Sequence, residues 1–326
     1  MKTKYYLSFF IFLFSLSCGD STNNKKTLSE NTAKKDNTWY STNKKKILSE
    51  NTGRQDEIIL VMDDIFWEGE VGELLRDIFE REISGLPQSE QFFNLVQINP
   101  SEFSRFFRTH KNIIFASIDL KDSYTRNKWA KAQIVMYLNC SSVDEGFRKS
   151  CNKAFNFINR KELENLKYAY EKGHNLKARK HIQYQFGIDL FLPTEYTISH
   201  KEDKVFISDF HSFNENQDLL KYILVYEFQP SGFNIQQEVL SLTDSILKKY
   251  ILGSIDGSFV QIDHRMSVVE SDGIYRGIWT LKNGFMGGPF VLKTKYIEDK
   301  IIISLGLVFY PNESKRKHVR TFEAIL

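Results

Sequence analysis

Three stretches near the C-terminus establish most of the topology of the second half of the chain. They are IYRGIWTL at residues 274–281, FVLKTKY at residues 290–296 and KIIISLGLVFY at residues 300–310. Each is rich in β-branched and aromatic side chains and has the length of a β-strand. GFMGGP, residues 284–289, separates the first two and has the glycine and proline content of a hairpin turn. Consecutive strands joined by short turns predict an antiparallel sheet.

The pattern of strands continues towards the N-terminus and is interrupted by one amphipathic helix. Apolar side chains recur at helical spacing between residues 236 and 252, and a short basic helix is expected over residues 315–326. Further strands are expected at residues 196–200, 205–210, 222–228 and 259–263.

The first half of the chain mixes strands with longer helices. Ile58–Met62 (IILVM) is a continuous apolar run that suits a buried strand. Apolar side chains then recur at helical spacing from residue 71 to residue 83, which predicts a helix. Strands are also expected at residues 112–120 and 133–139, followed by a long helix over residues 142–186 that breaks near Gly173.

These elements together predict an α+β fold, with mostly antiparallel sheets and helices packed on one face. The long helix separates two parts of similar size. We therefore expect two α+β lobes, at residues 57–186 and 187–326. A single continuous sheet is the alternative.

The charge balance argues against one class of function. The 326 residues include 44 basic and 41 acidic side chains, a formal net charge of +3. A protein that coats nucleic acid carries a concentrated basic excess, which this sequence lacks. The chain has no GxxxxGK[ST] phosphate loop, and its seven histidines never form an HExxH zinc motif. The sequence therefore predicts no nucleic-acid partner, no metal and no cofactor.

The N-terminus predicts export and a lipid anchor. Two lysines precede YYLSFFIFLFSL, residues 5–16, which is shorter than the roughly 20 residues of a membrane-spanning helix. The stretch ends at SLSCG, which is similar to a lipobox, the motif whose cysteine, here Cys18, receives acyl chains such as palmitate. Ser15 stands where that motif commonly has leucine. The alternative is an ordinary signal peptide (residues 1–18) that is cleaved nearby and leaves Cys18 as a thiol.

Residues 19–56 are expected to form a disordered tether, because they contain almost no apolar side chains that could build a core. The tether contains a duplication: STNNKKTLSENT at residues 21–32 recurs as STNKKKILSENT at residues 41–52. The duplication suits a tether whose length matters, or neutral slippage in a spacer that tolerates changes of length.

Cys140 and Cys151 are the two remaining thiols, and an oxidising compartment would favour a disulfide between them. Cys151 is expected to lie roughly 13 Å along the helix that follows Cys140. A disulfide needs Cα atoms within about 7 Å of each other. Two buried thiols are therefore favoured over the bond.

An acidic turn after the first strand is one candidate site. Asp63 and Asp64 precede Trp67, and adjacent carboxylates suit cation binding or acid–base chemistry. The alternative interpretation is that one of these aspartates caps the next helix while Trp67 packs against it.

A basic cluster in the same lobe is a second candidate. Arg105, Arg108 and His110 lie within six residues, and arginine pairs bidentately with carboxylate or phosphate. The alternative interpretation is a salt bridge from this cluster to the acidic turn.

The hairpin turn near the C-terminus is a third candidate. Phe285 and Met286 are expected at its tip, either offered to a partner or to lipid, or folded back onto the core. Trp279, in the strand before the turn, is included among the candidate binding residues.

The chain also resembles a known family of bacterial lipoproteins, the domain of unknown function 4837. The stretches that carry the resemblance cover nearly everything after the tether, and FMGGPF is the most specific of them. The resemblance implies a lipoprotein in the envelope of a Gram-negative cell, on its periplasmic or surface face. It implies no activity and no catalytic residues. The stretches begin at Ile59 (ILVMDDIFWEGEVGELLRDIF), Gly85 (GLPQSEQFFNL), Phe103 (FSRFFRTHKNII), Asp244 (DSILKKYILG) and Tyr275 (YRGIWTLKNGFMGGPFVLKTKY).

The sequence therefore favours a lipid-anchored, non-enzymatic protein that binds another envelope component, with an envelope protein as the expected partner. The alternative is an envelope enzyme or small-ligand binder. Such a protein would use the neighbourhood of Asp63, Asp64, Arg105, Arg108 and His110.

Overall fold

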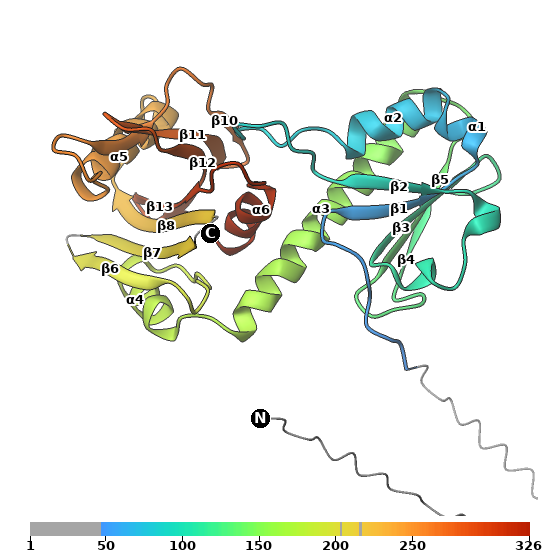
Figure 1. Ribbon diagram of the computed structural model, residues 1–326, viewed down its shortest axis with the longest axis horizontal. Coiled ribbons are helices and arrows are strands. Elements are labelled where there is room, and N and C mark those ends of the chain that lie inside the picture. Colours follow the sequence, from blue (N-terminus) through green and yellow to red (C-terminus); the bar gives the residue numbers. More distant parts are fainter. Residues whose placement is uncertain (1–46, 203, 215–216) are drawn as a thin grey trace, which may run out of the picture. The chain divides into compact units, whose positions relative to one another are not determined.

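The computed structural model describes residues 47–202, 204–214 and 217–326 (Figure 1). The expected lipidation site Cys18, the signal peptide and residues 19–46 of the expected tether lie outside these residues. The α+β class is confirmed, because strands and helices build two separate sheets with their own helical cover. Of the eleven strand pairings among the described residues, three are parallel and eight antiparallel.

The three parallel pairings all belong to the smaller sheet, whose strand order is β2-β1-β3-β5-β4. Strand β1, which lies between β2 and β3, is buried over its apolar run, as IILVM predicts. Strand β4 pairs antiparallel with β5 at one edge. The elements of this part are β1 (Glu57–Val61), α1 (Asp64–Trp67), α2 (Glu70–Phe79), β2 (Asn94–Ile98), β3 (Asn112–Ser117), β4 (Ser123–Arg126), β5 (Ile134–Asn139) and α3 (Glu145–Lys172).

The two faces of the smaller sheet have different cover. Helices α2 and α3 pack on one face, where Leu75 and Phe155 join the core beneath them. The other face is covered by two 3-10 turns, η1 (Pro100–Glu102) and η2 (Phe107–Thr109), and by aromatic side chains such as Phe103. Helices therefore lie on one face of this sheet, as expected.

The larger sheet is antiparallel throughout, with the order β10-β11-β12-β13-β8-β7-β6 and with β9 paired to β11. The FMGGPF turn joins β11 to β12, as the sequence predicts. The elements of this part are α4 (Leu176–Phe186), β6 (Thr197–Glu202), β7 (Val205–Asn214), β8 (Gln217–Phe228), α5 (Ile235–Tyr250), β9 (Phe259–Ile262), β10 (Val269–Ser271), β11 (Ile274–Lys282), β12 (Gly287–Ile297), β13 (Lys300–Phe309) and α6 (Arg316–Ile325).

Helices cover both faces of the larger sheet, which differs from the expected placement on one face. Ile302 packs with α4 and α6, whereas its neighbour Ile303 packs on the opposite face with α5. Neighbouring residues of a strand point to opposite faces. The unbroken apolar run of β13 therefore reflects a strand that is buried on both sides.

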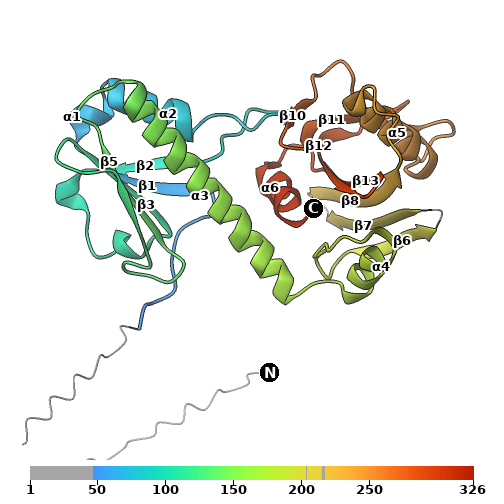
Figure 2. The same ribbon diagram turned by 180° about the vertical axis from the view of Figure 1, so that it is seen from behind.

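Helix α3 contributes to both cores (Figures 1 and 2). Ile158, in its first half, packs against the smaller sheet, and Leu166, in its second half, packs with the core of the larger sheet. The helix ends at Gly173, where the sequence predicts a break, and α4 packs against the larger sheet. The division between the two parts thus falls near residue 173 rather than at residue 187.

The chain contacts the smaller sheet before residue 57, the expected end of the tether. Ser49 and Thr52 form parallel bridges with Ala130 and His110. Asn51 Nδ2 donates a hydrogen bond of 2.9 Å to the carbonyl oxygen of Lys131. Residues 49–52 are therefore part of the folded structure, because their backbone groups find partners there.

Candidate functional site

The acidic turn lies at the C-terminal end of β1 and is exposed. Asp63 occupies the N-cap position of α1, but its side chain makes no capping hydrogen bond. Asp64 Oδ1 accepts a hydrogen bond of 2.9 Å from Gln97 Nε2. Trp67 is half-buried, and the guanidinium carbon of Arg76 lies 4.3 Å from its ring centroid. Trp67 thus packs near the turn, as the capping interpretation expects, although the capping bond itself is missing.

The basic cluster does not join this turn. His110 is buried beside the other end of β1, where its Nε2 lies 2.8 Å from Glu57 Oε1. Arg105 and Arg108 are exposed, and the guanidinium carbon of Arg108 lies 6.0 Å from the centroid of Trp129. The expected neighbourhood of acids, arginines and histidine is therefore not assembled.

The three candidates around the hairpin turn have different environments. Trp279 is buried in the core and its Nε1 donates a hydrogen bond of 3.2 Å to the carbonyl oxygen of Val308, so it is a core residue rather than a binding residue. Phe285 is fully exposed at the tip, and Met286 folds back against the core. Phe285 is thus free to meet a partner or lipid, whereas Met286 is folded back onto the core. The sequence left both positions open for these two residues.

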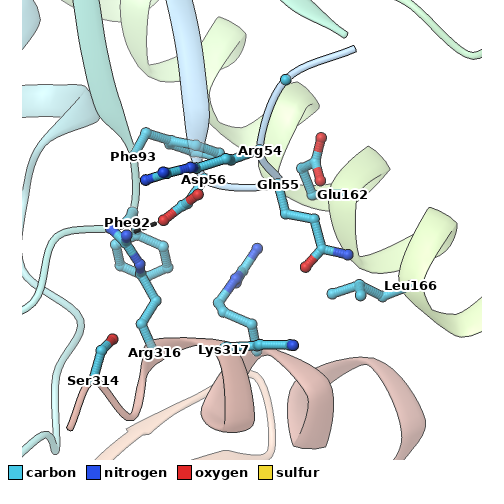
Figure 3. Close-up of a pocket in the computed structure, with 12 residues that line it drawn as sticks. Arg54, Gln55, Asp56, Phe92, Phe93, Glu162, Leu166, Ser314, Arg316 and Lys317 are labelled. Atoms are coloured by element: carbon cyan, nitrogen blue, oxygen red, sulfur yellow. Dashed lines mark hydrogen bonds and ion pairs between the residues drawn. The ribbon is translucent and has the colours of Figure 1, made fainter. Parts of the chain in front are cut away.

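A cavity of about 470 Å³ lies between the segment before β1, helix α3 and the N-terminal turn of α6 (Figure 3). Arg54 and Gln55 approach it from one side, and Arg316 and Lys317 from the other. Its lining combines charged and apolar side chains: Gly53, Arg54, Gln55, Asp56, Phe92, Phe93, Glu162, Leu166, Ser314, Arg316, Lys317 and Arg320.

Helix α6 is held beside the cavity by a carboxylate from the first half of the chain. Glu90 accepts hydrogen bonds from the backbone N–H groups of Lys315, at 2.7 Å, and Arg316, at 3.0 Å. These amides have no partner within the helix, and a carboxylate is favoured at the positive end of the helix dipole. Arg316 in turn pairs with Asp56 and donates a hydrogen bond of 2.8 Å to the carbonyl oxygen of Gln91.

The α3 side of the cavity contains a buried ion pair. Glu162 is 3% exposed and lies 2.8 Å from Lys111 Nζ. Its other oxygen accepts a hydrogen bond of 2.8 Å from Asn112 Nδ2. Both carboxylate oxygens are satisfied within the protein, so Glu162 stabilises the wall.

Positive charge is in excess around the cavity. Arg54, Arg316, Lys317 and Arg320 are set against only two lining carboxylates. Arg320 hydrogen-bonds to Glu323, which lies outside the lining. Burial, and then the charge of Arg320, lower the pKa of Arg316. Such a cavity can hold an anion.

Two of these cations have no acidic partner. Within the ranges that the structure describes, neither Arg54 nor Lys317 has a carboxylate within 4.0 Å. Both side chains are exposed at the opening. Phe92, Phe93 and Leu166 supply apolar surface beside them. The arrangement suits a ligand with a negative group and an apolar body.

No group of three or more His, Cys, Asp and Glu side chains is placed to hold a metal ion in the described part of the chain. The sequence does not reveal the cavity, because its cations come from segments that lie far apart in the chain. Arg54 lies in the expected tether, and Lys317 lies in the expected short basic helix. The run Lys315-Arg316-Lys317 is the one local feature of the sequence that points to it.

Cys140 and Cys151 are free and buried, as the sequence favours. Burial raises the pKa of both thiols, that of Cys151 to about 12. A thiol with a raised pKa forms little of the reactive thiolate at neutral pH.

Comparison with known proteins gives two family matches and no activity. No curated protein matches the chain. Residues 51–171 match a family model described as Domain of unknown function (DUF8532). The stretches from Ile59, Gly85 and Phe103 lie in that match, so the expected resemblance is confined to the second part of the chain. There, residues 175–326 match the family model described as Domain of unknown function (DUF4837).

Proposed function

We propose that this chain is a lipid-anchored envelope protein whose folded part binds an anionic group of another envelope component. The lipobox-like sequence at Cys18 supports the anchor. Within the described ranges, no helix has both the length and the apolar character to cross a membrane. The cavity beside α6 supports the binding role, and the protein acts there as a binding module rather than as a catalyst.

The observation that carries this proposal is the pair of cations at the opening, Arg54 and Lys317, which lack acidic partners. Other basic side chains near them, such as Arg316, are already paired with carboxylates. A ligand anion would therefore gain charge-assisted hydrogen bonds at the opening without displacing an internal ion pair.

The apolar lining narrows the class of ligand. Phe92, Phe93 and Leu166 border the same space, and burying apolar surface there adds to the attraction of the charges. A bare inorganic anion uses only the cations. We therefore expect a phosphate or carboxylate that is attached to an aromatic or aliphatic body.

Calorimetric titration of the full-length purified chain with phenyl phosphate tests the proposal, with inorganic phosphate and phenol as comparisons. Phenyl phosphate should bind more tightly than either. Arg54→Gln and Lys317→Gln should each weaken its binding by about tenfold, because each removes a charge-assisted hydrogen bond.

Lys201→Gln is the matched control, because Lys201 is an exposed cation on β6 and does not line the cavity. It should bind phenyl phosphate as the parent does. If Arg54→Gln and Lys317→Gln bind phenyl phosphate as tightly as the control Lys201→Gln does, the cavity is not the anion site. The same conclusion follows if phenol binds as tightly as phenyl phosphate.

The anchor is tested separately by intact mass. The chain extracted from membranes should begin at Cys18 and carry acyl mass, and Cys18→Ala should abolish that mass. An unacylated, soluble parent chain would refute the anchor and leave the titration result standing.

A further inference from the structure

An aromatic and basic surface lies on the smaller-sheet part of the chain, and none of its residues lines the cavity. The Phe106 surface is defined here by Arg105, Phe106, Arg108, Lys128 and Trp129. Phe106 is 82% exposed, although its ring lies only 5.4 Å from that of Phe107. An exposed phenylalanine between two arginines is not explained by core packing.

Two cations of this surface lie beside one indole ring. Lys128 Nζ lies 4.3 Å from the centroid of Trp129, and the guanidinium carbon of Arg108 lies 6.0 Å from it. Among the ion pairs of the described residues, none involves Arg105, Arg108 or Lys128. The nearest acid in the sequence is Glu102, three residues before Arg105. The surface therefore carries a net positive charge.

The described chain begins beside this surface. The Lys131 N–H donates a hydrogen bond of 2.9 Å to the Ser49 carbonyl, two residues after Trp129. The Thr52 N–H donates one of 2.8 Å to the carbonyl of Thr109, next to Arg108. The segment that leads from Cys18 thus joins the fold at the edge of the Phe106 surface, and 28 residues, 19–46, separate Cys18 from Ile47.

We infer that the Phe106 surface docks on the anionic lipid surface in which the chain is anchored. Basic side chains are attracted to anionic headgroups, and an exposed aromatic ring gains by entering the boundary between headgroups and acyl chains. The anchor keeps the local concentration of lipid high, and the surface beside the point of attachment meets lipid most often. This orientation rests on the proposed anchor, but the affinity of the surface for lipid is tested without it.

A fluorescent label beside Phe106 reports contact with lipid. Ser104 is exposed, and Ser104→Cys can be labelled with a nitrobenzoxadiazole dye because Cys140 and Cys151 are buried and an acylated Cys18 has no free thiol. If Cys18 is not acylated, the same label is placed in a Cys18→Ser background. Tyr184→Cys, on α4 and 92% exposed, is the control position. The parent chain, which lacks both engineered cysteines, gives the background labelling.

The labelled full-length chain is reconstituted into, or added to, phosphatidylcholine vesicles with and without phosphatidylglycerol. Quenchers attached to the lipid acyl chains should quench the label at position 104 several-fold more than that at position 184, and only when phosphatidylglycerol is present. Equal quenching at the two positions, or quenching that ignores phosphatidylglycerol, overturns the inference.

Two variants test which side chains are responsible. Phe106→Ser combined with Arg105→Gln and Arg108→Gln should reduce quenching at position 104 to the level at position 184. Phe233→Ser removes a ring that is 96% exposed elsewhere and should change nothing. An unchanged thermal transition shows that the variants are folded. Undiminished quenching in the triple variant would refute the inference that the Phe106 surface docks on lipid. A chain without acyl mass would refute only the proposed anchor.

Discussion

Glu323, on the last turn of α6, accepts a hydrogen bond of 2.7 Å from Arg276 Nε on β11, although the Glu323 side chain has no exposed surface. Arg320 donates a second hydrogen bond to the same carboxylate and a further one to Asn159 on α3. One buried carboxylate therefore links α6 to the larger sheet and, through Arg320, to α3. Helix α6 also forms one wall of the cavity, so this linkage positions Lys317.

Replacing Glu323 by alanine should lower the free energy of unfolding by about 3–5 kcal/mol, because one buried and one half-buried guanidinium group, those of Arg320 and Arg276, lose their counter-charge. Urea unfolding, followed by far-ultraviolet circular dichroism, measures the change. Asp77→Ala is the control, since Asp77 pairs with Arg148 at the surface with side-chain exposures of 65% and 48%. It should cost less than about 1 kcal/mol. Similar losses in both variants would show that the Glu323 cluster contributes no more than a surface pair.

His318 should make the protein less stable in mild acid. Burial, followed by the charges of Lys221 and Lys317, lowers the pKa of His318 to about 4, while Glu90 acts in the opposite direction. Between about pH 6.5 and pH 4 the unfolded chain binds a proton that the folded chain rejects. The stabilising effect of neutral His318 is therefore complete above pH 6.5 and is lost as the pH falls through this window.

The variant His318→Gln does not titrate and isolates this effect. The difference in unfolding free energy between about pH 7 and pH 4 should be smaller in the variant than in the parent, by up to about 3 kcal/mol. Carboxylates elsewhere titrate equally in both proteins and cancel in the comparison. Parallel pH profiles for the two proteins would contradict a depressed pKa at His318.

The sequence predicts strands best where they are buried, because a buried strand carries a run of apolar residues that can be recognised in the sequence. The strand β13 was predicted from its unbroken apolar run, because both of its faces are covered. The strand β4 (SYTR) was not predicted, because all four of its residues are exposed and carry no apolar pattern. It is a strand only because its backbone pairs with β5, and such pairing leaves no local signal in the sequence.

The expected neighbourhood of acids, arginines and histidine is not assembled for a related reason. Asp63 follows β1, whereas His110 precedes β3, and the two strands are parallel. Residues that follow one parallel strand and residues that precede another lie at opposite edges of the sheet. Without the strand directions, the sequence cannot separate these groups. The cavity cations Arg54 and Lys317 meet only through the packing of α6, which the sequence does not specify.

The β11–β12 hairpin offers a contrast between a core residue and an exposed one of similar chemistry. Trp279→Ala should lower the unfolding free energy by about 3–5 kcal/mol, because it empties a buried site and removes the hydrogen bond from the indole N–H to the Val308 carbonyl. Phe285→Ser should change it by less than about 0.5 kcal/mol, since the Phe285 ring is fully exposed. Urea unfolding of both variants measures these values.

The stability of the Phe285→Ser variant determines how the hairpin tip can be tested in cells. A variant that folds as well as the parent has lost only a surface group, so the disappearance of a cross-linked envelope partner in intact cells is then assigned to Phe285 itself. Combining it with Met286→Ser removes the rest of the turn's apolar surface, but Met286 also contacts the core, so that variant needs its own unfolding curve. A loss of more than about 1 kcal/mol in Phe285→Ser would contradict the exposed position of the ring. An unchanged cross-linking profile in a stable Phe285→Ser variant would exclude the tip as the contact and leave the cavity as the proposed binding site for an envelope component.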